Sequence, residues 1–433
     1  MKGLWRQVRS FDAPARLLMA NQFAINLGFF MLMPYLADHL AGGLGLAAWA
    51  VGLVLGVRNF SQQGMFVLGG TIADRFGYKT PIVIGCTLRT AGFALLGLVD
   101  SLPALVAASA AAGFAGALFN PAVRAYLAVE AGERRVEGFA LFNVFYQAGV
   151  LIGPLVGLAL LVWDFRAVCL TAAAVFAVLT VLQSRALPDR RPADDPGNGS
   201  SSASGTGPGA VAGVLGSWRQ VLGNRPFMLF SLAMIGSYVL TFQVYLALPL
   251  QAHRLLGSGG QAVTSGLFIV SAVVAVLGQL RITGWVRARW SGPQAIVGGI
   301  LLMGLAFAPL AASPDPSGGT PNAVVAVALL VIAVAVLAVG SAVVYPFEMD
   351  TIVTLSGERL VATHYGWYNT VSGLGITVGN LATGALWDVA DSGHRPWLPW
   401  LALTATGLLC AGCVHLLSRA GGLAAVAREP ALA

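Results

Sequence analysis

Long runs of hydrophobic residues recur along the chain, and each is about as long as a lipid bilayer is thick. A helix that crosses the hydrocarbon core needs about 20 mostly apolar residues, and twelve runs reach that length. Inside hydrocarbon a helix satisfies its own backbone hydrogen bonds, whereas the strands of a membrane barrel are about ten residues long and alternate in polarity. The pattern therefore predicts an all-α membrane protein. Its twelve transmembrane helices are expected at residues 15–38, 48–73, 80–99, 102–127, 137–161, 166–184, 226–252, 262–286, 293–313, 321–347, 362–387 and 396–418.

One polar segment interrupts this pattern and divides the predicted helices six and six. Residues 185–225 contain Pro188 and Pro192, followed by a Gly/Ser-rich run at 197–209. That composition is typical of a flexible linker. We therefore expect three parts, namely a first six-helix bundle, a cytoplasmic linker and a second six-helix bundle, at residues 1–184, 185–225 and 226–433.

The two halves also resemble each other in sequence, which supports the division. Gly64 and Gly70 each have a matching glycine 214 positions later. Internal repeats with a binding site at their interface are the architecture of many secondary transporters, so the bundles are expected to be pseudo-symmetric. Further residues match 225 or 226 positions apart: Pro121 and Pro346, Gly132-Glu-Arg and Gly357-Glu-Arg, Asn143 and Asn369, Gly149 and Gly375, Gly153 and Gly379.

Positive charge is distributed unevenly over the predicted loops, and this orients the helices. Of the 25 Lys and Arg residues, 18 lie in the termini and the loops on their side, 3 in the opposite loops and 4 within predicted helices. Because cytoplasmic loops carry the excess of Lys and Arg, both termini are expected in the cytoplasm. No cleavage pattern follows the first hydrophobic run, so that run is expected to be retained. We expect a multi-pass protein of the bacterial cytoplasmic (inner) membrane.

The composition excludes several other classes of protein. Only 10% of the 433 residues are charged, whereas a soluble domain has about 25%. The net charge of +7 comes without basic runs interleaved with aromatics, so no nucleic acid is expected as a partner. Cys410 and Cys413 have C-x-x-C spacing, but no second pair or His cluster accompanies them. No metal, cofactor or enzymatic activity is therefore expected.

The loop after the second predicted helix carries the motif Gly70-Thr-Ile-Ala-Asp74-Arg75-Phe-Gly77-Tyr78-Lys79. Gly77 permits a tight turn, and Asp74 could pair with basic groups or cap a neighbouring helix in one conformation only. The motif resembles the G-x-L-A-D-R-x-G-R-K signature of the major facilitator superfamily, with Tyr78 in place of a basic residue. The alternative is a simple loop stabiliser. The resemblance implies a conformational latch made by Gly70, Asp74, Arg75, Gly77 and Lys79.

The fifth predicted helix contains a second motif, Gly149-Val-Leu-Ile-Gly153-Pro154-Leu-Val-Gly157. Small residues four positions apart let helices approach closely, and Pro154 bends the helix. The motif is similar to the G-x-x-x-G-P pattern that marks antiporters within the superfamily. The resemblance therefore implies exchange rather than uniport or symport, with ordinary close packing as the alternative.

The resemblance covers nearly the whole chain. It is strongest to the twelve-helix drug:proton antiporter branch and, within that branch, to MdtH-like multidrug exporters. Residues 51–64 and 118–124 carry this likeness. It implies two pseudo-symmetric six-helix bundles, the MFS fold. One departure concerns the fourth helix, where Ser109 stands four residues before Gly113 in place of a common Arg. This chain therefore lacks, at this position, the Arg to which a role in proton coupling is usually given.

Ionisable residues inside the hydrophobic runs are candidates for proton coupling, because charges in the membrane are expensive. Glu348 or Asp350 could face Arg124 across the repeat interface, since both lie close to repeat-equivalent prolines. An acid at the membrane interface, paired with Arg359, is the alternative. Arg89 is a further embedded cation, and Arg281 lies near enough to a helix end to snorkel. The proton-coupling candidates are Arg58, Arg124, Glu348, Asp350 and Asp38.

In the fold that the resemblance implies, the central path is lined chiefly by helices 1, 4, 7 and 10, with help from 5 and 11. Polar and aromatic residues on these helices suit a bulky, weakly polar ligand. The substrate-cavity candidates are Asn21, Gln22, Asn26, Phe30, Gln63, Asn120, Asn143, Tyr146, Gln147, Tyr238, Gln243, Tyr245, Tyr345, Trp367, Tyr368 and Asn369.

The leading hypothesis is a secondary active transporter that works as a monomer. It exports small hydrophobic or amphiphilic compounds of multidrug type by proton antiport with alternating access. A dedicated exporter of one endogenous product, such as a siderophore or antibiotic, is an open alternative. A proton-coupled importer is disfavoured by the glycine-proline motif, and a non-transporting receptor would not need two repeated halves.

Overall fold

The computed structural model describes residues 2–190, 208–257, 260–314, 320–393 and 395–423. Within those ranges all regular secondary structure is helical. This confirms the all-α fold that the hydrophobic pattern predicts.

The first half begins with a short helix and continues with six spans, of which the second is broken. The break lies at Gly64 and Met65, where the chain turns between two shorter helices, and glycine is among the weakest helix formers. The elements are α1 (Lys2–Arg9), α2 (Ala13–Asp38), α3 (Ala48–Gln63), α4 (Phe66–Phe76), α5 (Lys79–Leu98), α6 (Leu102–Ala131), α7 (Arg135–Leu161) and α8 (Phe165–Ala186).

The second half repeats this plan, but here the first of its spans is the irregular one. That span consists of α10 (Arg225–Ala233), α11 (Ile235–Phe242), the 3-10 turn Gln243–Tyr245 and α12 (Ala247–Leu256). The remaining elements are α13 (Gly260–Arg287), α14 (Gly292–Leu305), the 3-10 turn Ala308–Ala312, α15 (Thr320–Ser356), α16 (Val361–Ser392) and α17 (Leu398–Arg419).

Nine stretches of the described residues are long and apolar enough to cross a membrane. One of them, Leu102–Leu161, contains both α6 and α7 and so provides two crossings. The broken span α3–α4 and the more polar helix α16 are not among the nine. Counting these three additional crossings recovers the twelve runs that the hydrophobic pattern predicts.

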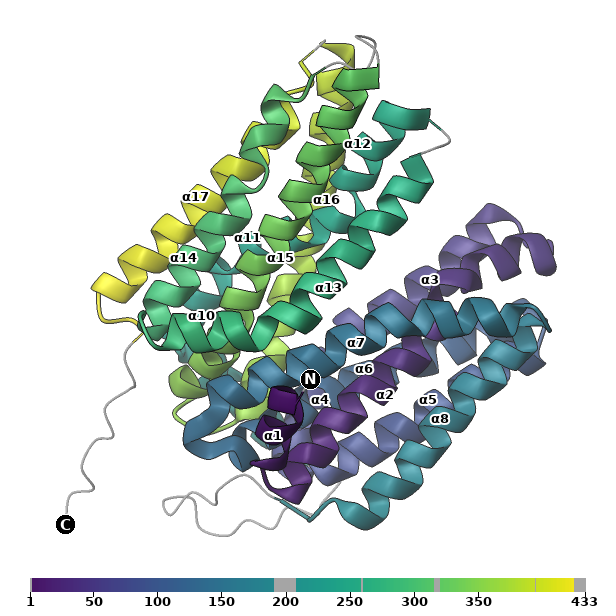
Figure 1. The fold of residues 1–433 in the computed structure, drawn as a ribbon. Coiled ribbons are helices and arrows are strands. Elements are labelled where there is room, and N and C mark those ends of the chain that lie inside the picture. Colours follow the sequence, from purple (N-terminus) through teal and green to yellow (C-terminus); the bar gives the residue numbers. More distant parts are fainter. Residues whose placement is uncertain (1, 191–207, 258–259, 315–319, 394, 424–433) are drawn as a thin grey trace.

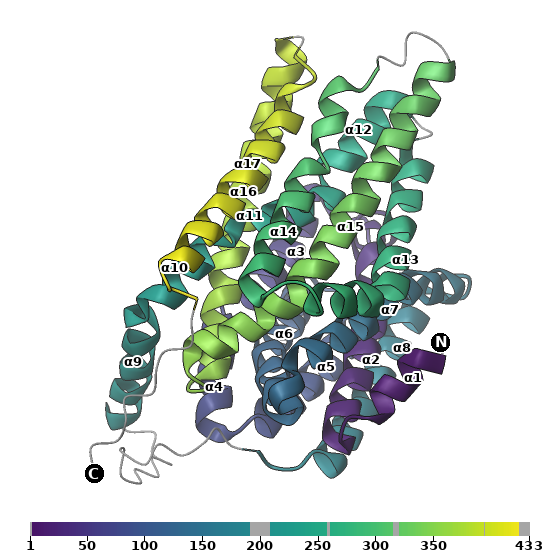
Figure 2. The same ribbon diagram turned by 60° about the vertical axis from the view of Figure 1, so that its left-hand side comes forward.

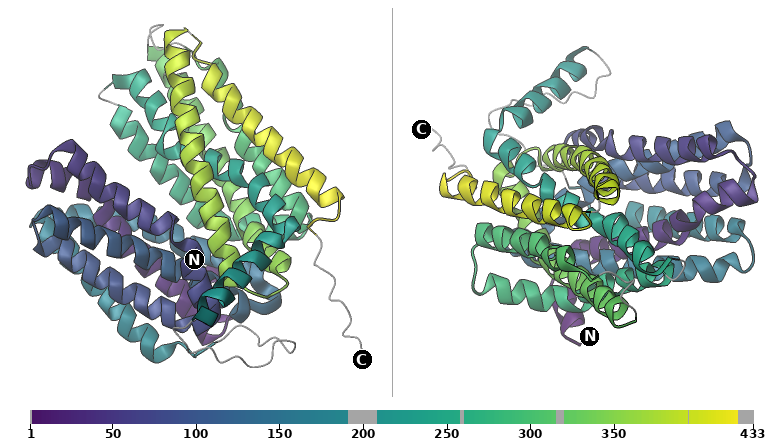
Figure 3. Two further views of the ribbon diagram at one scale, coloured as in Figure 1. Left: turned by 180° about the vertical axis from the view of Figure 1, so that it is seen from behind. Right: turned by 90° about the horizontal axis from the view of Figure 1, so that it is seen from above.

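The two bundles pack against each other at one end and splay apart at the other (Figures 1 and 3). The packed end, near residues 74–78, 132–135 and 357–363, is called the closed end below. The opposite end, near residues 44–48 and 395–398, is called the splayed end. Contacts between the bundles join α4 to α16 and α7 to α13.

The predicted linker, residues 185–225, contains a helix that the sequence pattern does not indicate. This helix, α9 (Pro208–Gly223), extends beside the closed end (Figure 2). The indole Nε1 of Trp218 donates a hydrogen bond of 2.8 Å to Oγ1 of Thr71 in the first bundle. Its ring lies edge-on to that of Trp367 in the second bundle, with centroids 6.1 Å apart. The segment therefore contacts both bundles.

Repeat-equivalent glycines make equivalent helix crossings in the two halves. A Cβ atom at Gly85 on α5 would lie 2.9 Å from the carbonyl oxygen of Ala115 on α6. A Cβ atom at Gly299 on α14 would lie 3.0 Å from the carbonyl oxygen of Gly340 on α15. The same backbone approach thus recurs at the offsets of 214 and 225 residues that relate the halves in sequence.

Candidate functional site

At the closed end, Asp74 from α4 binds the beginning of α16. Its carboxylate accepts hydrogen bonds from the backbone N–H groups of Ala362, at 3.2 Å, and Thr363, at 2.7 Å. The hydroxyl of Thr363 donates a third bond of 2.6 Å. These N–H groups belong to the first turn of a helix, where donors lack partners and the helix dipole favours negative charge. Asp74 of one bundle therefore caps a helix of the other.

The glycines of the same motif let the two bundles come together. Gly70 lies against the carbonyl group of Ala362, where a side chain would have no room. Gly366 on α16 is similarly placed, because its Cβ atom would lie 2.5 Å from the carbonyl oxygen of Phe66. Gly77 has a φ of 82° and ends α4 in a conformation that suits glycine. The helix α4 can approach α16 closely for these reasons.

The cations of the predicted latch lie apart from this contact. Arg75 is exposed and lies beside Gly213 of α9, while Lys79 is the first residue of α5. Asp74 itself lies just beyond the predicted span 48–73. Burial raises the pKa of its carboxyl group to about 6, although the hydrogen bonds from Thr363 and Ala362 act in the opposite direction.

Deeper between the bundles, a carboxylate lies within a group of tyrosines. Glu348 on α15 is 4% exposed. Its Oε1 atom accepts hydrogen bonds of 2.9 Å from the hydroxyl of Tyr238 on α11 and 2.5 Å from the hydroxyl of Tyr368 on α16. Three helices of the second bundle thus converge on one buried acid.

Arg124 on α6 reaches the same place from the first bundle. Its Nη1 atom donates a hydrogen bond of 3.1 Å to Oδ1 of Asn369. The guanidinium also lies beside the hydroxyl of Tyr345 and within electrostatic reach of Glu348. The structure therefore brings together six residues that the sequence singles out: Arg124, Tyr238, Tyr345, Glu348, Tyr368 and Asn369. These six residues are called the Glu348 cluster below.

Other proton-coupling candidates lie elsewhere. Asp350 forms an ion pair of 2.7 Å with Arg135, which also contacts Glu358 at 2.9 Å. This pairing is at the closed end, and sequence reasoning missed Arg135 because that residue lies outside the predicted spans. Arg58 contacts its own helix neighbours rather than the Glu348 cluster. The side chain of Asp38 lies outside the described residues.

The glycine-proline motif lets α7 pack closely against α2. A Cβ atom at Gly149 would lie 2.6 Å from the carbonyl oxygen of Phe23, and one at Gly153 would lie 3.0 Å from that of Leu27. Gly157 continues the contact against the carbonyl group of Met31. The carbonyl of Pro154 accepts a hydrogen bond of 2.7 Å from the hydroxyl of Tyr35 on α2. The backbone of α7 thus follows that of α2 for two turns.

A second polar contact joins the bundles through α7 and α13. The side-chain amide of Asn143 donates a hydrogen bond of 2.7 Å to Oε1 of Gln279. Gln279 is fully buried and also bonds to the carbonyl of Ala342 at 2.7 Å. The sequence pattern does not single out this glutamine, because α13 is outside the helices that are expected to line the path.

The remaining cavity candidates are dispersed. Asn21, Gln22 and Asn26 are buried along α2, and the side chain of Asn21 has no hydrogen-bond partner among the described residues. Other candidates bond within their own segment or contact nearby aromatic rings. These are Phe30 beside Phe29, Asn120 on Gly116, Gln243 on Val239, Tyr245 beside Phe268 and Trp367 beside Trp218. Gln63 packs against Gly373, and Tyr146 and Gln147 are half-buried on α7.

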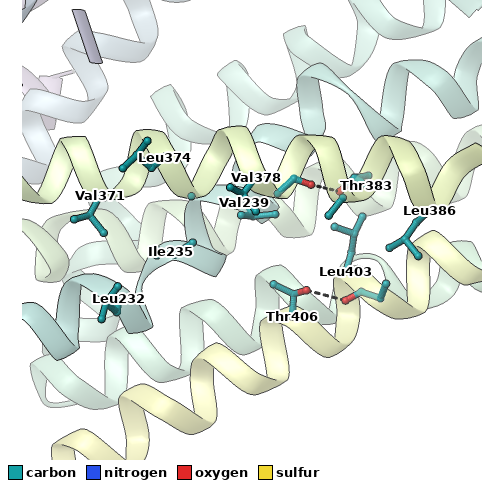
Figure 4. Close-up of a pocket in the computed structure, with 14 residues that line it drawn as sticks. Leu232, Ile235, Val239, Val371, Leu374, Val378, Thr383, Leu386, Leu403 and Thr406 are labelled. Carbon is teal, nitrogen blue, oxygen red and sulfur yellow. Dashed lines mark hydrogen bonds between the residues drawn. The ribbon is translucent and has the colours of Figure 1, made fainter. Parts of the chain in front are cut away.

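The second bundle also contains an apolar groove between α11, α16 and α17, with a volume of about 510 Å³ (Figure 4). Its walls include Ile235, Val239 and Leu403. The hydroxyls of Thr383 and Thr406 lie in it but bond to carbonyls of their own helices at 2.8 and 2.9 Å. The groove is thus almost wholly apolar, in contrast to the Glu348 cluster.

Residues 18–380 match the family model described as Major Facilitator Superfamily. The chain belongs to the major facilitator superfamily. It is therefore a multi-pass membrane transporter and not an enzyme, and the family resemblance found in its motifs is confirmed.

Members of the superfamily similar to this chain include both uncharacterised and named proteins. An uncharacterized MFS-type transporter of Mycobacterium tuberculosis is 54% identical over 401 residues, which cover 93% of this chain and 92% of the relative. The multidrug resistance protein MdtH of Yersinia pestis is 30% identical over 394 residues, with 90% and 91% coverage. MdtH of Shigella dysenteriae is 28% identical over 391 residues, with 90% coverage of each chain.

The fold itself has a counterpart among solved structures. The crystal structure of an auto-inhibited POT family peptide transporter superimposes with a TM-score of 0.64. The match covers 94% of this chain and 97% of that one at 18% identity. At this identity the likeness shows a shared fold alone.

Proposed function

We propose that this transporter exports small hydrophobic or amphiphilic compounds in exchange for protons, as a monomer in the bacterial inner membrane. The names of its MdtH relatives support multidrug-type export. The glycine-proline motif on α7 supports exchange. With both termini in the cytoplasm, as the Lys and Arg distribution predicts, the closed end is cytoplasmic and the structure is open to the outside.

The observation that carries the proton-coupling proposal is the position of Glu348. Two tyrosine hydroxyls donate hydrogen bonds to its carboxylate, and the positive charge of Arg124 in the same cluster favours the ionised form. Arg124 belongs to the other bundle, so its distance from Glu348 changes when the bundles rock. Proton binding at Glu348 would then depend on the conformation of the transporter, which is what exchange requires.

The closed end supplies the second element of the proposed cycle. Asp74 can cap α16 only when the two bundles meet at that end. When the bundles separate there, the N–H groups of Ala362 and Thr363 lose this acceptor and must bond to water. The cap thus favours the outward-open conformation and is broken in the inward-open one.

Dye efflux from cells or everted vesicles tests the proposal. We expect active efflux that a protonophore abolishes, and we expect Glu348→Gln to reduce it by about 100-fold or more because a neutral amide cannot carry the proton. Asp350→Asn is the matched control, since Asp350 pairs with Arg135 at the closed end and should retain proton dependence. Efflux that continues unchanged in Glu348→Gln would remove this residue from the coupling mechanism.

A dye panel separates the multidrug function from export of a single endogenous product. A multidrug exporter should move several unrelated apolar dyes, because apolar and aromatic surfaces bind ligands without strict geometry. A dedicated exporter should move at most one of them. Uptake driven by an inward proton gradient, in place of efflux, would contradict the proposed direction.

A further inference from the structure

Two arginines of the first bundle lie together inside the membrane-spanning region. Arg58 on α3 and Arg89 on α5 share the ring of Phe29, with their Cζ atoms 4.6 and 5.1 Å from its centroid. Arg89 is only 2% exposed. Its guanidinium is also within 5.8 Å of the rings of three more phenylalanines, Phe93, Phe119 and Phe176.

Within the described ranges, every partner of these two cations is neutral. Arg58 donates to Oδ1 of Asn59 at 2.8 Å and to Oε1 of Gln62 at 3.2 Å. Arg89 donates to the carbonyl of Ala112 at 3.1 Å. The Nε atoms of both arginines are buried without a hydrogen-bond partner, and no carboxylate in the described part of the chain forms an ion pair with either.

Such an arrangement is costly in the absence of an anion. A buried charge without a counter-ion loses its hydration, and two like charges that share one ring also repel each other. Contacts with aromatic faces offset part of this free-energy cost, and the hydrogen bonds to amide and carbonyl oxygens offset a further part. The two Nε–H groups stay unpartnered, so an anion close to the pair would offset part of the remaining cost through its charge.

The second half of the chain shows that the fold does not need these cations. At the offset of 214 residues that relates Gly85 to Gly299, Arg58 corresponds to Ala272 and Arg89 to Met303. The glycine crossing one turn from Arg89 recurs in the second half, since Gly85 and Gly299 each approach a carbonyl oxygen of the next helix. Apolar residues therefore build the second site, and the arginine pair of the first has a purpose other than packing.

Arg58 is placed where a ligand can approach it. Its neighbour Asn59 is exposed, and Arg58 itself is half-buried. One turn further along α3, the carbonyl of Gln63 accepts a hydrogen bond of 3.3 Å from Thr370 of α16. Arg58 therefore lies on the splayed side of the point where α3 meets the second bundle, with Arg89 behind it and apolar rings around it.

We propose that Arg58 and Arg89, with the amides of Asn59 and Gln62, bind the anionic group of an amphiphilic substrate. A carboxylate, sulfonate or phosphate would accept hydrogen bonds from the guanidinium of Arg58 and be attracted by the charge of Arg89. The aromatic surroundings suit the apolar part of the same molecule. This inference rests on the proposed export function and names its substrate class as amphiphiles with one negative charge.

Binding of two oppositely charged probes with one ring system tests this site. Naphthalene-2-sulfonate and naphthalene-2-methylammonium are titrated calorimetrically into the purified protein in zwitterionic phosphatidylcholine nanodiscs. We expect the sulfonate to bind at least about 10-fold more tightly, a ratio that corresponds to one charge-assisted hydrogen bond. We expect Arg58→Gln and Arg89→Met to abolish this preference and to change binding of the ammonium probe less than about twofold.

Arg281→Gln is the matched control, because Arg281 is an exposed arginine in the corresponding span of the second half; it should keep the preference. Equal weakening of both probes in Arg58→Gln, or no preference in the wild type, would overturn the proposal. Loss of the preference when phosphatidylglycerol is added would assign the site to a lipid headgroup instead of a substrate. Because binding is measured without a proton gradient, failure of proton-coupled efflux leaves this test intact.

Discussion

The helices α7 and α16 are repeat equivalents, yet they pack differently in their bundles. On α7, Gly149 and Gly153 bring the backbone against that of α2. On α16, the equivalent Gly375 and Gly379 meet the side chains of Ile235 and Val239 on α11. The apolar groove of about 510 Å³ lies along this second contact. The repeat thus preserves the glycines, but only the first half uses them for direct backbone contact.

The buried ionisable groups also differ between the two halves. The first half contributes the buried or half-buried cations Arg58, Arg89 and Arg124, and the second contributes the buried acid Glu348. Packing glycines recur at the repeat offsets, whereas these charged residues do not. The common scaffold therefore explains the fold, and the residues that break the repeat are where the transport chemistry is to be sought.

The largest effect is expected from filling the backbone contact of the first half. The Cβ atom of Gly149→Ala would lie 2.6 Å from the carbonyl oxygen of Phe23, so α7 must move away from α2. Overpacking of this kind costs about 1–3 kcal/mol. Gly375→Ala should cost less than about 1 kcal/mol, because the side chain of Ile235 can move into the adjoining groove. Thermal unfolding of both variants in detergent checks the order, and equal losses would show that the two contacts are equally rigid.

The hydrophobic pattern could predict the spans because each must be apolar over its whole length. It could not predict the breaks in α3–α4 and α10–α12, since Gly64 alone does not distinguish a break from close packing. Nor could it predict α9, because the Gly/Ser-rich run before Pro208 dominates the composition there. What α9 adds is a tertiary contact, Trp218 with Thr71, which no local pattern indicates.

The next largest effect is expected from removing the cap at the closed end. Asp74→Ala places in α4 the residue that the second half has at the repeat equivalent, Ala288. It leaves the N–H groups of Ala362 and Thr363 without their acceptor, and such a loss costs about 1–2 kcal/mol. We expect the inward-open population to rise by about 5- to 30-fold. Distances between spin labels on the two bundles at the closed end measure this, and an unchanged distribution would contradict the latch.

Acidity should act through the same carboxyl group. The pKa of Asp74 is about 6 in this structure, whereas an exposed aspartate has an ordinary pKa near 3.9. The arrangement with the higher pKa binds the proton more tightly, so acidification stabilises the closed end relative to a state with Asp74 exposed. The closed population should increase as the pH falls from about 7 through 6, and Asp74→Ala should remove this dependence. A closed population that decreases on acidification would show that another group controls it.

The Glu348 cluster could be predicted in part for the same reason that the spans could. Tyr238, Tyr368 and Glu348 stand out because polar groups are rare within apolar helices. Their mutual hydrogen bonds could not be predicted, since the rotation of each helix about its axis depends on packing. The same limit made Asp350 a plausible partner for Arg124, although two residues along α15 turn its side chain toward Arg135.

The smallest effect on the closed population is expected at the second contact of the closed end, where exposed ion pairs stand in place of the Asp74 cap. At the end of α13, Arg287 lies 3.7 Å from Glu137 in the first turn of α7, and Arg134 lies 2.7 Å from the same carboxylate. This is the repeat counterpart of Asp74 on α16, but about a third or more of each of these side chains is exposed. Water and salt screen such pairs, which contribute about 0–1 kcal/mol. Glu137→Gln should therefore shift the spin-label distances far less than Asp74→Ala, and the shift should disappear in high salt. A salt-independent shift as large as that of Asp74→Ala would show that the α7–α13 contact and the α4–α16 contact stabilise the closed end equally. The two contacts would then differ in residue type but not in the free energy that they contribute.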